Sequence, residues 1–256
     1  MYLVAVHGYP LDGRMWGPIS ERLERKGTCR VVAPDLRGRG ASTRPAAPVH
    51  AMSLFADDLA ADLPALVPPA EPFVLCGLSM GGYVLFELLR RHAEFLKHRL
   101  SGVVLCDTRA TADDETGRAK RREAIEAIGR NGIEAAFHAM LPKLLSAQSK
   151  GTPAEALVTK MILATPPATA CADLAGLAVR SEGFDVLGPL AVPVLVVVGE
   201  DDVLTPPADA EALAAACANA PYVRLLTVPG AGHMAPLEQP DEVAAAVAAL
   251  ISRSRH

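Results

Sequence analysis

The chain has 256 residues, half of them hydrophobic, and carries 25 lysines and arginines against 29 aspartates and glutamates, for a formal net charge of −4. This length fits one large domain or a domain with an insertion, and the apolar fraction is sufficient for a core without metals or disulfides. The charges are scattered, so no basic stripe indicates nucleic acid and no polybasic patch indicates an anionic membrane. No segment approaches the roughly 18 consecutive apolar residues that a membrane-spanning helix needs.

The cysteines and the N-terminal segment favour a cytoplasmic protein. The five cysteines are odd in number and widely spaced, and no pair has the close spacing of a zinc or redox motif. Cys76 and Cys106 lie in apolar, strand-like runs, which indicates reduced, buried thiols. The first residues run straight into His7 without a basic leader, so they predict a strand rather than a signal peptide.

Short apolar runs alternate with helical patterns along most of the chain. Several runs are continuous valine and leucine without polar alternation, which is typical of strands buried on both faces of a parallel sheet. The alternation therefore predicts an α/β fold with a mostly parallel sheet of about six strands flanked by helices. The predicted strands are 2–6, 30–33, 73–76, 102–106, 194–198 and 223–228. The predicted helices between them are 17–25, 53–67, 82–96, 207–218 and 241–252.

One long segment breaks this alternation. Between Asp107 and Asp185 no strand is evident, and helix-favouring stretches cover 116–130, 133–145 and 153–164. We expect a helical cap inserted after the fourth strand and packed over the carboxyl edge of the sheet. The domain organisation is then an α/β core formed by residues 1–107 and 186–256, with a cap formed by 108–185. The basic run 118–122 is interpreted as a solvated helix face, because acidic residues at 113–115 and 123 balance it.

The most informative motif is Gly77-Leu78-Ser79-Met80-Gly81, which ends an apolar run and opens a helical pattern. A Gly-x-Ser-x-Gly sequence in that position is typical of a nucleophile elbow, where a serine sits on a sharp strand-to-helix turn. The hydroxyl needs a base, and the base needs an orienting acid. His233 follows the sixth strand between glycines and a proline-containing segment, and we predict that it is the general base. His7, after the first strand, is interpreted as structural.

Position alone does not determine the orienting acid, since four acidic residues lie near strand ends: Asp107, Glu200, Asp201 and Asp202. The order serine, aspartate, histidine along the chain is that of the α/β-hydrolase fold and differs from the chymotrypsin and subtilisin folds. The backbone N–H of Met80, at the start of the helix after Ser79, is suited to hold a developing oxyanion.

The chain resembles the α/β-hydrolase superfamily over nearly its whole length, and in particular its capped esterase, 3-oxoadipate enol-lactonase-like and C–C hydrolase branch. The motifs that carry the resemblance are His7-Gly8, the segment 34–42, the segment 77–82, Gly199-x-x-Asp202-x-x-x-Pro206 and Gly232-His233. The resemblance implies that Asp202 is the acid, although some relatives carry it at the position of Asp107. It also places the second oxyanion donor at the backbone N–H of Tyr9.

One departure from the family pattern concerns the start of the sheet. Family members begin with an antiparallel hairpin before the strand that carries His-Gly, whereas here Met1 almost adjoins that strand. We therefore expect a sheet two strands shorter than usual, with an exposed edge covered by loops or by a second copy in a homodimer.

The expected activity is that of a serine hydrolase that cleaves a small carboxylic ester or lactone through an acyl-enzyme, without a metal or organic cofactor. Alternatives are cofactor-free perhydrolysis, C–C bond hydrolysis, or a ligand receptor that does not turn over. Arg109 is placed either to meet a substrate carboxylate or to pair with Asp107 or Asp113. The residues expected to line an apolar pocket are Trp16, Met80, Phe137, Met140 and Met234.

Overall fold

A single six-stranded sheet forms the centre of the computed structural model, which describes residues 1–254. The strand order is β2–β1–β3–β4–β5–β6, and every neighbouring pair is parallel. The α/β fold with about six strands is therefore confirmed. The strands are β1 (Tyr2–Val6), β2 (Arg30–Val32), β3 (Phe73–Leu78), β4 (Leu100–Cys106), β5 (Val194–Gly199) and β6 (Val223–Val228).

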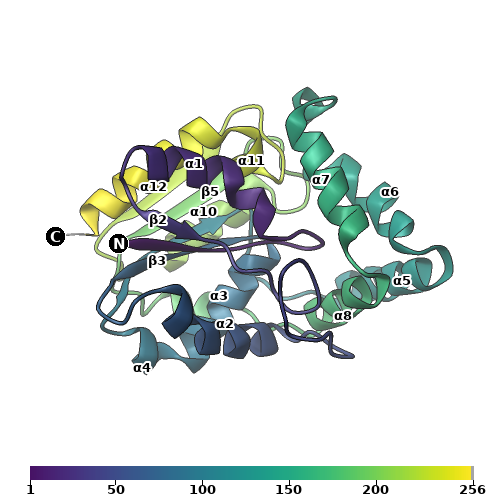
Figure 1. Ribbon diagram of the computed structural model, residues 1–256, viewed down its shortest axis with the longest axis horizontal. Coiled ribbons are helices and arrows are strands. Elements are labelled where there is room, and N and C mark those ends of the chain that lie inside the picture. Colours follow the sequence, from purple (N-terminus) through teal and green to yellow (C-terminus); the bar gives the residue numbers. More distant parts are fainter. Residues whose placement is uncertain (255–256) are drawn as a thin grey trace.

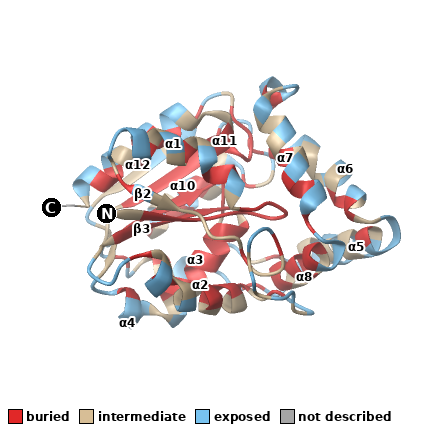
Figure 2. Cartoon of the chain, in the orientation of Figure 1, coloured by how far each residue is buried: buried red, intermediate tan, exposed pale blue. Residues whose placement is uncertain are grey.

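The central strands are buried because helices cover both faces of the sheet. Every residue of β3 and β5 is buried, which explains why their sequences are continuous apolar runs. Figure 2 shows this buried centre beneath helices whose outer faces are exposed. Helices α1 (Gly17–Arg25) and α12 (Pro240–Arg253) pack together on one face, and α2 (Met52–Leu66) and α3 (Met80–Arg91) pack together on the other (Figure 1).

The remaining core helices are short or lie at the end of the sheet. Helix α10 (Pro207–Ala216) packs against β5 and β6. The helix expected over 82–96 is two helices, because the chain leaves helical geometry at His92 between α3 and α4 (Ala93–Leu96). The 3-10 turn η1 (Gly13–Trp16) precedes α1, and α11 (Ala235–Glu238) precedes α12.

The segment between β4 and β5 is helical, as expected. It contains α5 (Glu115–Asn131), α6 (Ile133–Leu144), the 3-10 turn η2 (Ala147–Ser149), α7 (Pro153–Ala164), α8 (Pro167–Ala178) and α9 (Phe184–Leu187). Helices α5–α8 stand together beyond the carboxyl ends of the strands, and we call these four helices the cap (Figure 1). The expected boundary at 185 falls inside α9. Helix α8 was not predicted, because Pro166 and Pro167 suggest a turn, whereas a proline is well tolerated in the first turn of a helix.

Buried ionic contacts hold the cap on the core. Arg39 and His50 lie in the segment after β2, and both contact the carboxylate of Asp173 on α8. The Nδ1 atom of His50 is 2.7 Å from Asp173 Oδ1, and all three side chains are almost completely buried. The backbone N–H of His50 also donates to Ala172 O at 2.9 Å. Because breaking one partner of a buried ion pair leaves an uncompensated charge, these contacts fix α8 against the core.

His7 ties β1 to the segment that follows β2. Its Nε2 atom accepts a hydrogen bond from the N–H of Leu36 at 3.0 Å, so Nδ1 carries the proton and donates to Gly8 O at 3.0 Å. Burial, and then the positive charge of Arg39, lowers the pKa of His7 from 6.5 to about 4. These contacts agree with the structural role expected for His7.

Within residues 1–254, no single helix is long and apolar enough to cross a bilayer. Helices α7 and α8 reach that length and composition only when they are taken together, and they are bent by 96° at the break between them.

The close contact between α8 and the core gives a stability prediction. A Cβ atom at Gly176 would lie 1.7 Å from the carbonyl oxygen of His50. We expect Gly176→Ala to lower the free energy of unfolding by about 1–3 kcal/mol, the usual cost of overpacking. Gly129→Ala on α5 is the control, because nothing lies within 4 Å of its Cβ position, and it should gain up to about 1 kcal/mol from helix propensity. Urea unfolding measures both, and equal stability of the two variants would contradict this packing.

The lowered pKa of His7 gives a pH dependence. Between pH 6.5 and about 4 the unfolded chain protonates this imidazole and the folded chain does not, so the stabilisation present above pH 6.5 is lost as the pH falls. At about 1.4 kcal/mol per pH unit, the wild type should lose about 2 kcal/mol from His7 between pH 7 and pH 5. The variant His7→Gln keeps an acceptor for Leu36 and does not titrate. Urea unfolding at both pH values should therefore show a shallower loss in the variant, and parallel losses would refute the role of His7.

Candidate active site

Ser79 stands on the turn between β3 and α3 with a backbone φ of 52°, in the left-handed region that few non-glycine residues adopt. The glycines around it make this turn possible. A Cβ at Gly81 would lie 2.2 Å from the carbonyl oxygen of Val6, and one at Gly77 would lie 2.7 Å from the backbone of Gly81. Only glycine allows the start of α3 to come this close to β1, which pushes Ser79 to the end of the sheet.

The end of β4 holds this turn in place. The N–H of Ser79 donates to Cys106 O at 3.0 Å, and the hydroxyl of Thr108 donates to Ser79 O at 2.8 Å. The strained turn is therefore fixed through both backbone polar groups of the serine, and its hydroxyl is left to face the cavity described below.

Asp202 and His233 form a buried pair from the loops after β5 and β6. Nδ1 of His233 is 2.8 Å from Asp202 Oδ2, and the two side chains are 3% and 0% exposed. Asp202 Oδ1 also accepts from the N–H groups of Leu204 and Thr205, at 2.8 and 3.1 Å, and Oδ2 accepts from the Thr205 hydroxyl at 2.6 Å. This geometry makes Nδ1 of His233 the donor and leaves Nε2 able to accept a proton.

Charge and hydrogen bonding keep this carboxylate ionised. Burial by itself would raise the pKa of Asp202, but the charge of His233 and the hydrogen bonds from His233 and Thr205 outweigh burial, so the pKa is lowered.

The other three candidate acids are placed differently. Glu200 and Asp201 are exposed on the same loop. Asp107 is fully buried, and its carboxylate accepts from the N–H groups of Gly199 at 2.8 Å and Ala235 at 3.3 Å. Burial, and then the charge of Asp202, raises the pKa of Asp107 well above its ordinary value. Of the four, Asp202 is the one whose carboxylate contacts the imidazole of His233.

Ser79 and His233 line one cavity of about 1200 Å³ between the ends of the strands and the cap. Within residues 1–254, no hydrogen bond joins the Ser79 hydroxyl to the imidazole. Bonds of this kind are often long before substrate binds and shorten in the Michaelis complex. The structure thus brings the serine, and the histidine with its acid, to the same cavity.

Tyr9 and Met80 line the cavity beside Ser79. Met80 is the first residue of α3, so its N–H has no acceptor within the helix. Tyr9 follows Gly8, where a Cβ would lie 3.3 Å from the Cβ of Ser79, so this loop passes directly over the serine. Within the described chain, neither amide donates a hydrogen bond. Both predicted oxyanion donors are therefore adjacent to the nucleophile and unengaged.

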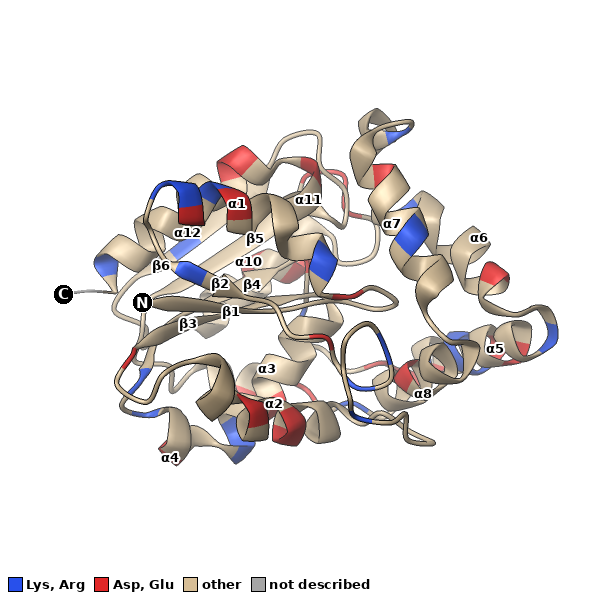
Figure 3. Ribbon diagram, in the orientation of Figure 1, with Lys and Arg blue, Asp and Glu red and all other residues tan. Residues whose placement is uncertain are grey.

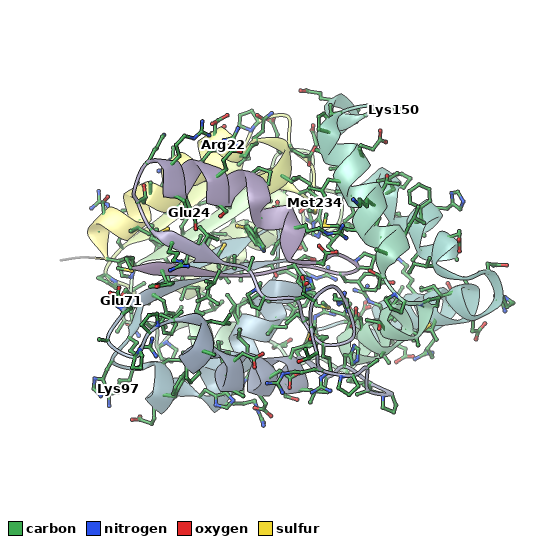
Figure 4. All side chains as sticks on the ribbon, in the orientation of Figure 1. Arg22, Glu24, Glu71, Lys97, Lys150 and Met234 are labelled. Carbon is green, nitrogen blue, oxygen red and sulfur yellow. The ribbon has the colours of Figure 1, made fainter. Side chains whose placement is uncertain are left out.

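Of the six residues expected to line the pocket or meet the substrate, the cavity wall contains three: Met80, Arg109 and Met140. Trp16, Phe137 and Met234 are not among the lining residues, which corrects that expectation. Trp16 and Met234 are buried in the core, and Met234 directly precedes α11 (Figure 4). The ring of Phe137 packs against His138 on α6, with the ring centres 5.1 Å apart. Side chains that are apolar enough to line a pocket are equally suited to the core, and packing decides between the two.

Two basic side chains of α5 lie at the cavity. Lys120 and Arg121 line the cavity, although the run 118–122 was interpreted as a solvated face. Arg118 and Arg122 do pair with Glu115 at the surface. Helical spacing could have indicated their position at the cavity. One face of α5 contains the buried Ile128 and also positions 117, 120, 121 and 124. Figure 3 shows that α5 carries both basic and acidic residues.

The carboxylate of Asp113 forms ion pairs with three arginines at this wall. Its Oδ1 is 2.8 Å from Arg180 Nη1 and 3.4 Å from Arg109 Nη2, and its Oδ2 is 3.0 Å from Arg121 Nε. Of the two partners foreseen for Arg109, Asp113 is the one it contacts. Within residues 1–254, no group of three or more His, Cys, Asp or Glu side chains is arranged to hold a metal ion.

Known proteins match both the sequence and the fold. A family model described as "Alpha/beta hydrolase family" matches residues 3–246. A pimeloyl-[acyl-carrier protein] methyl ester esterase of Xanthomonas campestris pv. campestris is 30% identical, over 96% of this chain and 92% of that protein. A thermophilic esterase from Thermogutta terrifontis, solved with malate bound, is 35% identical with a TM-score of 0.89, over 100% of this chain and 91% of that chain. The enol-lactonase from Burkholderia xenovorans LB400 is 27% identical with a TM-score of 0.81, over 98% and 91%.

These relatives are named as esterases and a lactonase, so the prediction of an enzyme of the carboxylic ester hydrolase class, EC 3.1.1, is confirmed at that level. The family model spans almost the whole described chain, and relatives of 30–35% identity cover nearly all of it. The chain therefore belongs to the α/β-hydrolase family.

Proposed function

We propose that this protein is a serine hydrolase that cleaves a small carboxylic ester or a lactone through an acyl-enzyme. The observation that carries the proposal is the buried Asp202–His233 pair opening onto the cavity that Ser79 also lines. Ser79 is the nucleophile, His233 the general base and Asp202 the acid that orients the imidazole.

Acylation begins when Nε2 of His233 takes the hydroxyl proton as Ser79 Oγ attacks the carbonyl carbon. The carbonyl oxygen becomes an oxyanion, and the N–H groups of Tyr9 and Met80 stabilise it because they are fixed before substrate arrives. Collapse of the tetrahedral intermediate breaks the bond to the alkoxy oxygen, which takes the proton from His233. In a lactone the freed alcohol stays attached to the acyl chain.

Deacylation repeats the same steps with water as the nucleophile. His233 removes a proton from water, the resulting hydroxide attacks the acyl carbon, and Ser79 Oγ leaves with the proton that His233 returns. Asp202 stays ionised throughout and stabilises the imidazolium that forms twice in each turnover. Its hydrogen bonds from Leu204 and Thr205 hold it in the required orientation.

We infer that the enzyme works in the cytoplasm. Cys76, Cys106, Cys171 and Cys217 are not joined in disulfides, and such thiols remain reduced in that compartment.

Activity measurements test the role of Ser79 as the nucleophile. A panel of p-nitrophenyl esters of increasing chain length and several lactones should be hydrolysed by the wild type, and Ser79→Ala should lower kcat by about 10⁶-fold. A fluorophosphonate probe should label the wild type and not Ser79→Ala. Hydrolysis that survives in Ser79→Ala would remove this mechanism, and a wild type that the probe does not label would favour a ligand receptor. Peracid formation from acetate and peroxide in place of ester cleavage would favour a perhydrolase.

Activity measurements also test the role of Asp202 as the orienting acid. Asp202→Asn removes the charge that orients His233 and should lower kcat by about 10⁴-fold with a small change in KM. Asp201→Asn is the matched control on the same loop, since its side chain is exposed, and it should stay within about twofold of the wild type. Steady-state kinetics on one p-nitrophenyl ester measure both variants. A larger loss in Asp201→Asn than in Asp202→Asn would overturn the assignment.

A further inference from the structure

The guanidinium of Arg121 is held in the cavity wall with its outer edge free. Arg121 is on the first half of α5, lines the cavity and has a side chain that is 25% exposed. Its Nε donates to Asp113 Oδ2 at 3.0 Å. Within residues 1–254, neither of its two Nη atoms forms a hydrogen bond. Asp113 therefore fixes the orientation of the fork through one nitrogen and leaves the two terminal nitrogens for another acceptor.

The charge of Asp113 is already neutralised from the other side. The Arg180 side chain is 1% exposed, lies over the ring of Tyr83 and forms an ion pair with Asp113 Oδ1 at 2.8 Å. Arg109 also approaches Oδ1, and the carboxylate of Asp209 on α10 lies within its electrostatic reach. Three guanidinium groups thus face two carboxylates, which leaves one positive charge in excess. Arg109 and Arg121 both line the cavity and both contact Asp113. Arg109 is also within electrostatic reach of Asp209, whereas Arg121 is held through Nε at 3.0 Å with both Nη atoms unbonded within the described chain.

The other charged groups of the cavity wall do not cancel this excess. Lys120 and Lys143 are matched in number by Asp114 and Glu123. Arg121 is also within electrostatic reach of the Tyr9 hydroxyl, and Tyr9 lies beside Ser79. A substrate in the cavity is therefore exposed to an excess positive charge at the cap wall, where partial burial strengthens its field.

We propose that Arg121 determines specificity by binding a carboxylate at the far end of the acyl chain of the substrate. This inference rests on the proposed function and names the substrate class, which is a half-ester of a dicarboxylic acid or a lactone that bears a carboxylate. The free edge of a guanidinium matches a carboxylate with two parallel N–H···O bonds, which a lysine does not reproduce. A contact to the acyl half persists through both acylation and deacylation, whereas a contact to the alcohol is lost after the first step.

The test compares two p-nitrophenyl esters of similar length, the half-ester of glutaric acid and the neutral pentanoate. The wild type should prefer the half-ester in kcat/KM. In Arg121→Gln the ratio of kcat/KM for the half-ester to that for the pentanoate should fall by about 10- to 100-fold, mainly through KM. Arg121→Lys keeps the positive charge but loses the paired N–H groups of the guanidinium, so its kcat/KM ratio should lie between those of the wild type and Arg121→Gln. Arg122→Gln is the matched control, because the neighbouring Arg122 pairs with Glu115 at the surface, and its ratio should equal that of the wild type.

Each outcome is decisive. The inference is overturned if the wild type does not prefer the half-ester, or if Arg121→Gln leaves the ratio unchanged. In both cases Ser79-dependent hydrolysis of the pentanoate would still support the proposed function. If the wild type hydrolyses neither ester, the proposed function itself is overturned. If Arg121→Gln does not fold, inhibitors can test the carboxylate site in the wild type, with the pentanoate ester as substrate. Glutarate and malate should compete with the ester and neutral glutaramide should not, and equal inhibition by all three would contradict a carboxylate site.

Discussion

The end of β4 is the point on which the geometry of the candidate active site depends. Cys106, Asp107 and Thr108 contact the three loops that carry the proposed nucleophile, acid and base. Cys106 O and the Thr108 hydroxyl hold the backbone of Ser79. The Asp107 carboxylate accepts from Gly199, which begins the loop of Asp202, and from Ala235, two residues beyond His233. Asp107 itself has a backbone φ of 44°, a strained conformation that persists because these contacts over-determine it.

Two neighbouring carboxyl groups have opposite electrostatic environments at this point. Asp202 has the imidazole of His233 and three hydrogen-bond donations, and its pKa is lowered. Asp107 is surrounded by backbone and by the charge of Asp202, and its pKa is raised. Like charges in a buried site disfavour each other's ionisation, so the hydrogen-bond environment assigns the charge to one of the two. This difference in pKa supports the electrostatic role proposed for Asp202, whereas the hydrogen bonds of Asp107 hold the loops.

The cap contributes basic and apolar side chains to the cavity wall, whereas the core contributes the groups that we propose react with the substrate. Ser79, His233, Tyr9 and Met80 come from loops at strand ends, and Arg121 and Met140 come from α5 and α6. The buried contacts of Asp173 with Arg39 and His50 fix α8 to the core, and α8 packs against α5. The position of α5 relative to Ser79 is therefore set by a chain of buried contacts rather than by the helix itself.

Local patterns in the chain were enough to identify the strands, most helices and the turn at Ser79. Continuous valine and leucine runs mark β3 and β5 because both faces of these strands are covered, and the glycines around Ser79 mark a turn that only glycine permits. The contact between Asp202 and His233, the exclusion of Trp16 and Met234 from the cavity, and the inward position of Arg121 became clear only in the folded molecule. The pattern of a segment shows that a side chain is buried or charged, but the partner that it meets comes from elements far away in the chain. Neighbouring residues such as Asp201 and Asp202, or Arg121 and Arg122, are alike in composition and differ in the direction that packing gives them.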